Sequence, residues 1–301
     1  MYRRVLVTGG NGLLGTKTIG LLLAQGRQPL SASVEPECLN SFLGDFPYYP
    51  LDITDAEAVS RLFAESRPDA VVHTAAFTAV DACETQRELS WRVNVDGTAN
   101  VASACREHGA RLVHVSTDYI FDGEDGPYTE EDEPNPISHY GAGKLESEKA
   151  VKSRCLDWVI GRTMVLFGDA PNVRPSFVKW LVDNLSRGQS VRIVDDQIGS
   201  PTLADNLAEM LVALLDSGKI GIYNTAGDAL VDRHEFAVMA ARLFGLDSGL
   251  IQRIKTKDLN QPAPRPLKSG LIMDKFKAEF PSIHVLTAEE SLLRLKTAST
   301  D

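Results

Sequence analysis

The chain has few cysteines and no long apolar run, and both shortages narrow what it can be. Its four cysteines, Cys38, Cys83, Cys105 and Cys155, are widely spaced and form no CxxC pair. This spacing argues against a disulfide frame or a zinc site and favours reduced thiols in a cytoplasmic protein. No stretch reaches the roughly 18 apolar residues that a membrane helix requires, so we expect no membrane association. The apolar run 5–7 is also too short for a signal peptide.

Positive charge is scarce as well. Lysine and arginine number 31 against 41 aspartates and glutamates, which leaves a formal net charge of −10. A general nucleic-acid binder normally presents a basic face, so we expect no nucleic-acid partner. The composition, with 43% hydrophobic and 24% charged residues, is otherwise typical of a globular protein. A few backbone amides and one or two arginines could still bind a phosphorylated small molecule.

The first 165 residues alternate short β-branched runs with longer helical segments. The predicted strands are 3–8, 30–34, 46–50, 70–74, 111–116 and 158–162, and the predicted helices are 14–25, 56–65, 83–108 and 140–152. Strands separated by helices of ten or more residues indicate βαβ units. The fold class is therefore α/β, with a Rossmann-type doubly wound parallel sheet.

The rhythm of the chain changes after Thr163. The predicted helices are now 176–186, 204–215, 233–243 and 288–295, mixed with isolated strands at 191–194 and 221–225 and a proline-rich loop at 261–266. We predict that residues 1–165 form a dinucleotide-binding domain, to which later segments at about 188–225 return. Residues 166–301 are then mainly a smaller C-terminal substrate-binding lobe.

A glycine-rich turn separates the first predicted strand from the first predicted helix. Its glycines follow the spacing GxxGxxG rather than the more familiar GxGxxG. Glycines allow a tight turn and a close backbone approach, and the start of the helix attracts a pyrophosphate. The residues predicted to bind the dinucleotide here are Gly9, Gly12, Leu13, Leu14 and Gly15.

The end of the second predicted strand should distinguish the two nicotinamide cofactors. Glu35 lies 20 residues after Gly15, where an acidic side chain can accept a hydrogen bond from the ribose 2′-hydroxyl. No arginine occurs at 31–37 to receive a 2′-phosphate, so NAD(H) is favoured over NADP(H), which stays the alternative. Asp52 and Ile53, after the third strand, are candidates for the adenine side. Asp52 could equally serve as a turn or cap residue.

Tyr140 and Lys144 form the pattern YxxxK at the start of a predicted helix. A spacing of four places both side chains on one face, where a cation would lower the pKa of the phenol, normally ~10. Thr117, with Ser116 before it, ends a predicted strand 23 residues upstream, at the edge where doubly wound sheets carry reactive groups. Either hydroxyl could bind a substrate carbonyl oxygen or simply cap a turn. Together with the glycine loop, these residues predict a dehydrogenase-type site.

Six stretches of the chain carry a family resemblance. They are Thr74–Asp81, Asn94–Thr98, Ser116–Gly123, Tyr140–Leu145, Asp196–Thr202 and Arg265-Pro266. On these stretches, which span nearly the whole length, the chain resembles the extended short-chain dehydrogenases/reductases, and within them the dTDP-4-dehydrorhamnose reductases.

The resemblance implies an NAD(P)H-dependent reduction of the 4-keto group of a nucleotide-linked 6-deoxyhexose, dTDP-4-dehydro-L-rhamnose to dTDP-L-rhamnose. It implies catalytic roles for Thr117, Tyr140 and Lys144, with Asp118 beside the sugar. The further positions implied at the cofactor are Ala75, Ala76, Asn94 and Val115, with Asn94 supporting the catalytic lysine. Apart from the resemblance, Arg265 follows a proline-rich turn and is predicted to bind the substrate diphosphate, because a guanidinium suits phosphate geometry. Gln197 is a candidate substrate contact, with a structural role in its loop as the alternative.

Two positions depart from the family pattern. Val165 occupies a place beside the sugar where many of these reductases have tryptophan, which makes the particular sugar less certain than the chemistry. Lys17 occupies the place of a glutamate that binds magnesium at a dimer contact in some bacterial members. We therefore expect no metal, and a homodimer stays open.

Two other interpretations remain. The regulatory β subunit of methionine adenosyltransferase is similar in its glycine loop and YxxxK pair, so a non-catalytic NAD(P)-binding partner of another enzyme is one alternative. A reductase acting on a different nucleotide sugar is the other. Dehydratases on this scaffold usually have an Asp-Glu pair after the reactive hydroxyl, and Asp118-Tyr119 argues against them. His73 and His114, inside predicted strands, are interpreted as core residues.

Overall fold

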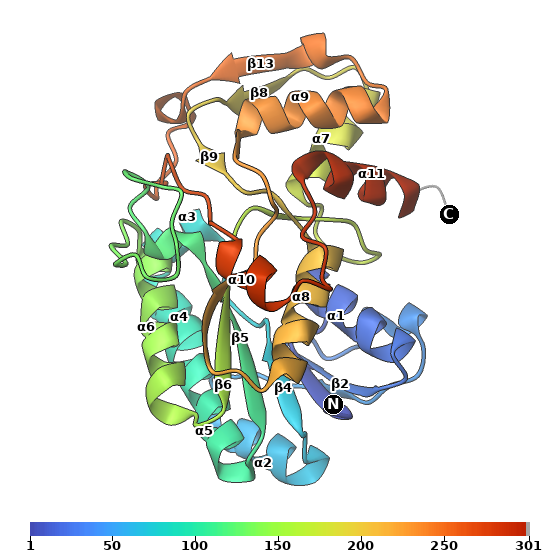
Figure 1. Cartoon of the computed structure of the whole chain (residues 1–301), viewed down its shortest axis with the longest axis vertical. Coiled ribbons are helices and arrows are strands. Elements are labelled where there is room, and N and C mark those ends of the chain that lie inside the picture. Colours follow the sequence, from blue (N-terminus) through green and yellow to red (C-terminus); the bar gives the residue numbers. More distant parts are fainter. Residues whose placement is uncertain (299–301) are drawn as a thin grey trace.

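A seven-stranded sheet forms the centre of the computed structural model, which describes residues 1–298 (Figure 1). Its strands, in spatial order, are β11 (Gly221–Asn224), β6 (Trp158–Thr163), β5 (Arg111–Thr117), β4 (Ala70–His73), β1 (Arg4–Thr8), β2 (Gln28–Ser33) and β3 (Tyr48–Pro50). Every pairing in this sheet is parallel. From β1 the chain winds first toward β3 and then back toward β11, which confirms the predicted doubly wound α/β fold.

Helices cover both faces of the sheet. On one side α1 (Leu13–Ala24) packs against α8 (Ala204–Ser217), and on the other lie α2 (Ala56–Ser66), α5 (Thr98–His108) and α6 (His139–Arg154). Successive residues of β1 alternate between the two layers: Val5 and Val7 pack in the core with α1 and α8, and Leu6 packs in the core with α2 and α5. A strand that is buried on both faces has a continuous apolar sequence, because its two sets of side chains both meet helices.

The segment before α5 differs from the prediction. The expected single helix over 83–108 is wrong in its first half, where the chain forms α3 (Val80–Thr85), α4 (Arg87–Trp91) and the π-helical turn η2 (Arg92–Gly97). The wider turn of η2 carries Asn94 to the peptide of Phe77, to which it makes two hydrogen bonds. Such turns are common at functional sites, and this one lies beside α6.

A second lobe stands above the carboxyl edge of the sheet (Figure 1). Here β8 (Val191–Val194) pairs in parallel with β13 (Ile251–Ile254). The helices α7 (Phe177–Ser186), α9 (Arg233–Phe244) and α11 (Ala288–Ala298) share a separate apolar core with these strands. Within the segment 188–225, α8 packs against α1 and β11 pairs with β6 of the sheet, whereas β8 pairs with β13 in the second lobe. The boundary at 165 stays a prediction.

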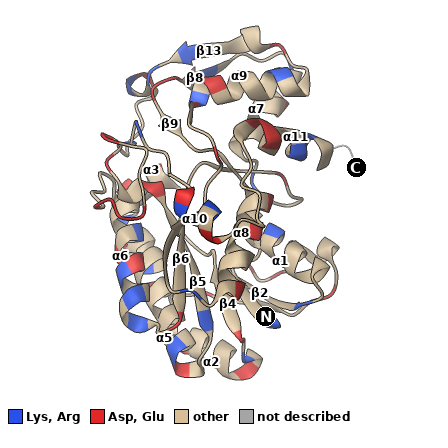
Figure 2. Ribbon diagram, viewed as in Figure 1, with Lys and Arg blue, Asp and Glu red and all other residues tan. Residues whose placement is uncertain are grey.

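The described chain also contains several short elements. They are β7 (Leu166–Phe167), β9 (Ile198–Gly199), β10 (Thr202–Leu203), β12 (Val231–Asp232), α10 (Asp274–Glu279) and the 3-10 turns η1 (Ser41–Leu43), η3 (Asp118–Ile120), η4 (Ser248–Leu250) and η5 (Thr256–Leu259). Figure 2 shows basic and acidic residues interspersed along both lobes rather than separated by sign. Within residues 1–298, no helix is both long and apolar enough to span a bilayer.

Candidate active site

Three glycines of the loop between β1 and α1 are required for different reasons. Gly9 has a φ of 69°, and a Cβ there would lie 2.7 Å from the backbone nitrogen of Ala75. A Cβ at Gly15 would overlap the carbonyl oxygen of Gly9, so this glycine lets α1 pack against the loop. At Gly12 a Cβ would meet only one atom, the Gly9 oxygen at 3.2 Å. Gly9 thus closes the turn, Gly12 stays open to a ligand, and Gly15 permits close packing. Dinucleotide-binding loops have these three roles in the same order.

The first turn of α1 offers its amides to an anion. Gly12 is the N-cap, and no side chain from residues 1–298 caps this helix. Leu13 and Leu14, the first two helical residues, therefore present backbone N–H groups at the positive end of the helix dipole. A dinucleotide pyrophosphate has the charge and the acceptor oxygens to bind there, and the loop fits such a group.

Glu35 follows β2 and is half-buried beside the glycine loop. Its Oε2 accepts a hydrogen bond of 3.2 Å from Nδ2 of Asn11, whose backbone N–H donates to Ser33 Oγ. Asn11 thus ties the loop to the segment after β2, a role that was not predicted from the sequence. The pattern could have suggested it, since Asn11 is a polar residue among the glycines.

Other predicted cofactor residues differ in what they contact. Ala75 lies against Gly9, as its position after β4 suggests. Ala76 is half-buried next to it. Asp52 is exposed and accepts a hydrogen bond from the N–H of Thr54, so the structure shows the turn-forming alternative for its side chain. Ile53 is buried against η2.

Tyr140 occupies the first turn of α6, one residue after the helix begins. Ser138 caps the helix through a hydrogen bond from the N–H of Gly141 to its hydroxyl. The Tyr140 side chain is buried, and its ring lies edge-on to that of Tyr119 at 5.4 Å between centroids. Burial is the main cause that raises the pKa of Tyr140 above its usual value; Asp118 also raises it, and a hydrogen bond with Thr117 lowers it.

Lys144 does not act on Tyr140 in the way that the spacing suggested. Its Nζ donates a 2.8 Å hydrogen bond to the carbonyl oxygen of Val115 in β5 and lies 3.4 Å from Nε2 of His114. Burial lowers the pKa of Lys144 to about 8, while the Glu148 carboxylate works in the opposite direction. The i, i+4 spacing places both residues on one face, but the long lysine side chain turns its charge toward the sheet.

Asn94 also differs from its implied role as a support of the catalytic lysine. Its Oδ1 accepts from the N–H of Phe77 at 2.8 Å and its Nδ2 donates to the Phe77 carbonyl oxygen at 3.1 Å. The amide therefore fixes the loop after β4, through the π turn, whereas Lys144 is held by the Val115 carbonyl instead.

His73 and His114 are core residues, as expected. Both are buried, and their rings stack at 5.4 Å between centroids. His73 bonds to Thr8 and Thr98, and His114 bonds to the hydroxyl of Ser147. Burial is the first cause that lowers the pKa of His73 to about 3, so it is neutral at physiological pH. His114 immediately precedes Val115, whose carbonyl oxygen accepts the hydrogen bond from Lys144, and His73 is its neighbour in β4.

Thr117 and Asp118 end β5 and begin η3. The Thr117 hydroxyl donates to Asp118 Oδ1 at 3.1 Å, and Ser269 donates to Asp118 Oδ2 at 2.7 Å. Burial raises the pKa of Asp118 to about 6, against the effect of these two hydrogen bonds and of the nearby Arg233 charge. The neighbouring Ser116 hydroxyl is buried without a hydrogen-bond partner among residues 1–298. Because Tyr140 has a hydrogen bond with Thr117, Thr117 is the hydroxyl beside Tyr140.

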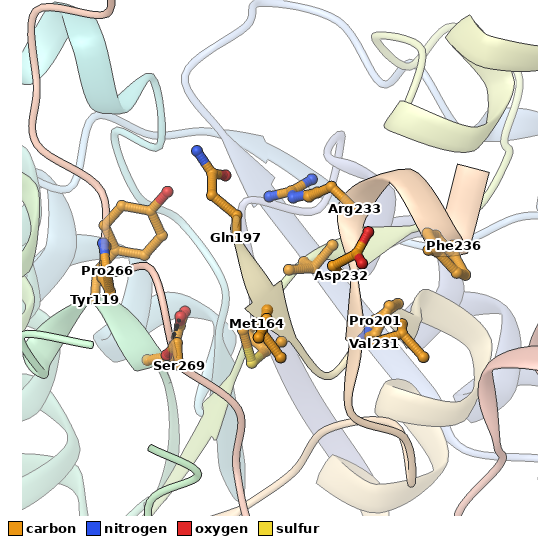
Figure 3. A pocket seen from close by; sticks show the side chains of 14 residues that line it. Tyr119, Met164, Gln197, Pro201, Val231, Asp232, Arg233, Phe236, Pro266 and Ser269 are labelled. Atoms are coloured by element: carbon orange, nitrogen blue, oxygen red, sulfur yellow. Dashed lines mark hydrogen bonds between the residues drawn. The ribbon is translucent and has the colours of Figure 1, made fainter. Parts of the chain in front are cut away.

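A pocket opens between the sheet edge and the second lobe, and Figure 3 shows its side chains. At one end Tyr119, Gln197 and Arg233 direct their polar groups toward a common space, and Met164 lies on the apolar floor. The polar end and the apolar floor together suit a ligand with one charged and one less polar part.

Val165 and Gln197, both candidates for substrate contact, line this pocket. Val165 adopts a φ of 44° in the left-handed region, an uncommon conformation for a β-branched residue. The Gln197 side chain donates to the hydroxyl of Thr256 at 3.0 Å. These contacts position both residues at the pocket but do not by themselves identify a ligand.

The arginine that enters the pocket is not the one that was predicted. Arg265 forms an ion pair of 2.9 Å with Asp81 and donates to the carbonyl oxygen of Ala263. Arg233, at the first position of α9, lines the pocket instead. Arg233 was not predicted from the sequence, because only the packing of α9 beside the sheet edge brings it there. Lys17, which occupies the place of a metal-binding glutamate in some relatives, pairs with Asp205 at 3.1 Å.

Comparison with known proteins places the chain among sugar-nucleotide reductases. Residues 3–294 match the family model described as the RmlD substrate binding domain. The chain is 35% identical over 300 residues to a probable low-salt glycan biosynthesis reductase of Haloferax volcanii, covering 98% of each chain. It is 37% identical over 282 residues to the dTDP-4-dehydrorhamnose reductase of Streptomyces griseus, covering 91% of this chain and 87% of that one. The crystal structure of the Bacillus anthracis dTDP-4-dehydrorhamnose reductase in complex with NADP matches with a TM-score of 0.88 and 30% identity, over 99% of this chain and 100% of that one.

Proposed function

The chain belongs to the RmlD substrate-binding-domain family, and on this premise we propose that it reduces the 4-keto group of a nucleotide-linked 6-deoxyhexose, converting dTDP-4-dehydro-L-rhamnose to dTDP-L-rhamnose. It is an NAD(P)-dependent oxidoreductase of the dTDP-4-dehydrorhamnose reductase class. The observation that carries the proposal is that Tyr140 and Thr117 are buried together at the sheet edge, next to the pocket.

The glycine loop and α1 would hold the nicotinamide dinucleotide, with Leu13 and Leu14 donating to its pyrophosphate. The bound cofactor supplies the hydride to the substrate keto carbon. Glu35 would accept from a ribose 2′-hydroxyl, and its carboxylate would repel a 2′-phosphate, so we propose a preference for NAD(H) over NADP(H). The related enzyme from Bacillus anthracis was crystallised with NADP, which keeps this preference a specific point for measurement.

Tyr140 would donate the proton to the keto oxygen. Its raised pKa keeps the phenol protonated and ready to act as an acid in the resting enzyme. Thr117 would polarise the same oxygen, which requires its hydroxyl to turn from Asp118 toward the substrate. Lys144 would stabilise the phenolate once it forms, which requires its ammonium to turn from Val115 and His114 toward Tyr140.

Three further expectations accompany this function. The four cysteines are all free thiols, which supports a reducing, cytoplasmic location. We propose that residues 1–165 bind the dinucleotide and that the substrate lies mainly against residues 166–301. The absence of a metal stays a prediction, and formation of a homodimer stays open.

The reaction itself tests the proposal. Purified protein mixed with NADH or NADPH and dTDP-4-dehydro-L-rhamnose should oxidise the cofactor. Tyr140→Phe should reduce turnover by about 100-fold or more while leaving the dissociation constant of the cofactor nearly unchanged. A mutant that keeps most of its turnover would show that Tyr140 is not the proton donor. Failure of the natural protein to oxidise either cofactor, together with a stable complex with a methionine adenosyltransferase, would favour the regulatory-subunit alternative.

A further inference from the structure

Arg233 carries a charge that the protein leaves unbalanced. No hydrogen bond or ion pair reaches its guanidinium from residues 1–298. Its only close side-chain contact that the structure identifies is the ring of Phe177, 5.6 Å from the guanidinium carbon to the ring centroid. Burial lowers the pKa of Arg233, which shows that the surroundings disfavour the charge. The Arg233 side chain is half-buried, and a cation that is partly removed from water and has no partner is stabilised when a ligand supplies the opposite charge.

The carboxylates around Arg233 are already engaged. Asp232, its neighbour in sequence, caps α9 by accepting from the N–H of Glu235 at 2.7 Å. Asp118 accepts from Thr117 and Ser269. Neither forms an ion pair with Arg233, although the charge of Asp118 is close enough to affect it.

Arg265, the other arginine of this region, is in the opposite state. Its guanidinium pairs with Asp81 of α3 and also donates to the Ala263 carbonyl oxygen. Both arginines act electrostatically on the phenol of Tyr119, but of the two only Arg233 lines the pocket. One is satisfied by the protein, and the other is not.

We propose that Arg233 binds the diphosphate of the nucleotide-sugar substrate, opposite Gln197 and Tyr119. A guanidinium binds phosphate oxygens through two parallel N–H donors, which a diphosphate can accept. Figure 3 shows the Arg233 guanidinium extended toward the Gln197 amide, so that a group between them would meet donors from both sides. The identity of the sugar rests on the proposed function; the assignment of the diphosphate to Arg233 does not.

Binding of dTDP and of thymidine tests the assignment without turnover. Arg233→Met keeps an unbranched apolar side chain against Phe177 and removes the charge. We expect it to weaken dTDP binding by tenfold or more in titration calorimetry and to leave thymidine binding unchanged. Arg233→Lys should restore only part of the affinity, because an ammonium lacks the planar fork. Arg265→Met is the matched comparison and should affect dTDP less than Arg233→Met.

The thermal unfolding of the ligand-free variants separates this role from a structural one. Removal of an unpaired, partly desolvated charge should leave the melting temperature of Arg233→Met unchanged or higher, and dTDP should no longer raise it. Wild-type affinity of Arg233→Met for dTDP, a larger loss in Arg265→Met, or a lower melting temperature without ligand would each overturn the proposal. If no 4-keto sugar nucleotide is reduced but Arg233→Met still loses dTDP, the reductase function fails and the diphosphate site stands.

Discussion

The two ends of the candidate active site are built in different ways. At the cofactor end, the glycine loop, β2 and β4 satisfy one another: Asn11 bonds to Glu35 and Ser33, and Gly9 packs on Ala75. At the substrate end, Arg233 has no partner for its charge among residues 1–298. The cofactor end is thus preformed by the protein alone, whereas the substrate end keeps an unbalanced charge that a ligand can complete. Preorganisation suits a cofactor used for every turnover, and an open charge favours the substrate that neutralises it.

The largest effect should follow a change in the preformed end. Gly15→Ala would force a methyl group into the carbonyl oxygen of Gly9, at a cost of about 3 kcal/mol or more. We expect a lower free energy of unfolding and loss of cofactor binding, measured by denaturant titration and by quenching of protein fluorescence with NADH. Gly20→Ala is the control within α1: its Cβ would lie 3.6 Å from Leu43, and alanine is the better helix former. Equal behaviour of the two variants would contradict the close-packing role of Gly15.

The next largest effect concerns the hydroxyl at the junction of the two ends. Thr117→Val preserves shape and should lower kcat by about 100-fold, because the keto oxygen loses a donor. Ser116→Ala should be mild, since the Ser116 hydroxyl has no hydrogen-bond partner among the described residues. The measurement is kcat of both variants from steady-state kinetics at a saturating cofactor concentration. The reverse order would transfer the reactive hydroxyl to Ser116.

A smaller effect is expected from Asp118, which borders the open end. Its pKa in the folded protein is about 6, above the usual 3.8. The folded carboxyl therefore holds its proton more tightly than the unfolded one, and this contribution to stability is fully present below about pH 4 and is lost as the pH rises through 6. Relative to Asp118→Asn, the natural protein should lose free energy of unfolding between pH 4 and 7, by about 1.4 kcal/mol for each tenfold difference in proton affinity between the folded and unfolded carboxyl.

Asp122→Asn supplies a control of opposite sign for this pH dependence. Hydrogen bonds from Glu124, Tyr128 and Asn135 lower the pKa of Asp122. Its stabilising contribution is present above the unfolded pKa and is lost as the pH falls. Denaturant titrations of both variants from pH 3 to 8 should give slopes of opposite direction. A flat difference for Asp118→Asn would show that its carboxyl is not perturbed in the folded protein.

The smallest effect should come from the choice between cofactors. Glu35→Ala removes a carboxylate that would repel a 2′-phosphate, and it should raise kcat/KM for NADPH relative to NADH by about tenfold, or 1.4 kcal/mol. Glu37→Ala is the matched control, since Glu37 is exposed and only its backbone carbonyl is bound by Asn11. An unchanged ratio in Glu35→Ala would refute a preference for NAD(H) based on this residue.

The features predicted from the sequence are those carried by neighbouring residues. The parallel sheet follows from alternating runs such as Val5–Val7, and the glycine loop and the YxxxK pair are recognised from a few consecutive positions. The burial of His73 and His114 follows from their place inside strands. Each of these depends on local periodicity, which is visible along one segment of chain.

The features that escaped prediction depend on residues far apart. Arg265 and Asp81 are 184 positions apart, and their ion pair takes up the side chain that was assigned to the substrate. Lys144 turns to Val115, and Asn94 to Phe77, for backbone partners that spacing on a helix cannot reveal. Arg233 reaches the pocket only through the packing of α9, for which the sequence carries no short-range signal.

The left-handed backbone of Val165 has a consequence for how this protein can change. A β-branched side chain in this conformation costs about 1–3 kcal/mol, which the folded chain bears whether or not substrate is bound. Glycine or asparagine would relieve that strain but would also replace an apolar wall of the pocket. Selection for heat resistance and selection for a particular sugar therefore favour different residues at the same position. Lineages that differ in growth temperature should diverge here before they diverge at the glycine loop.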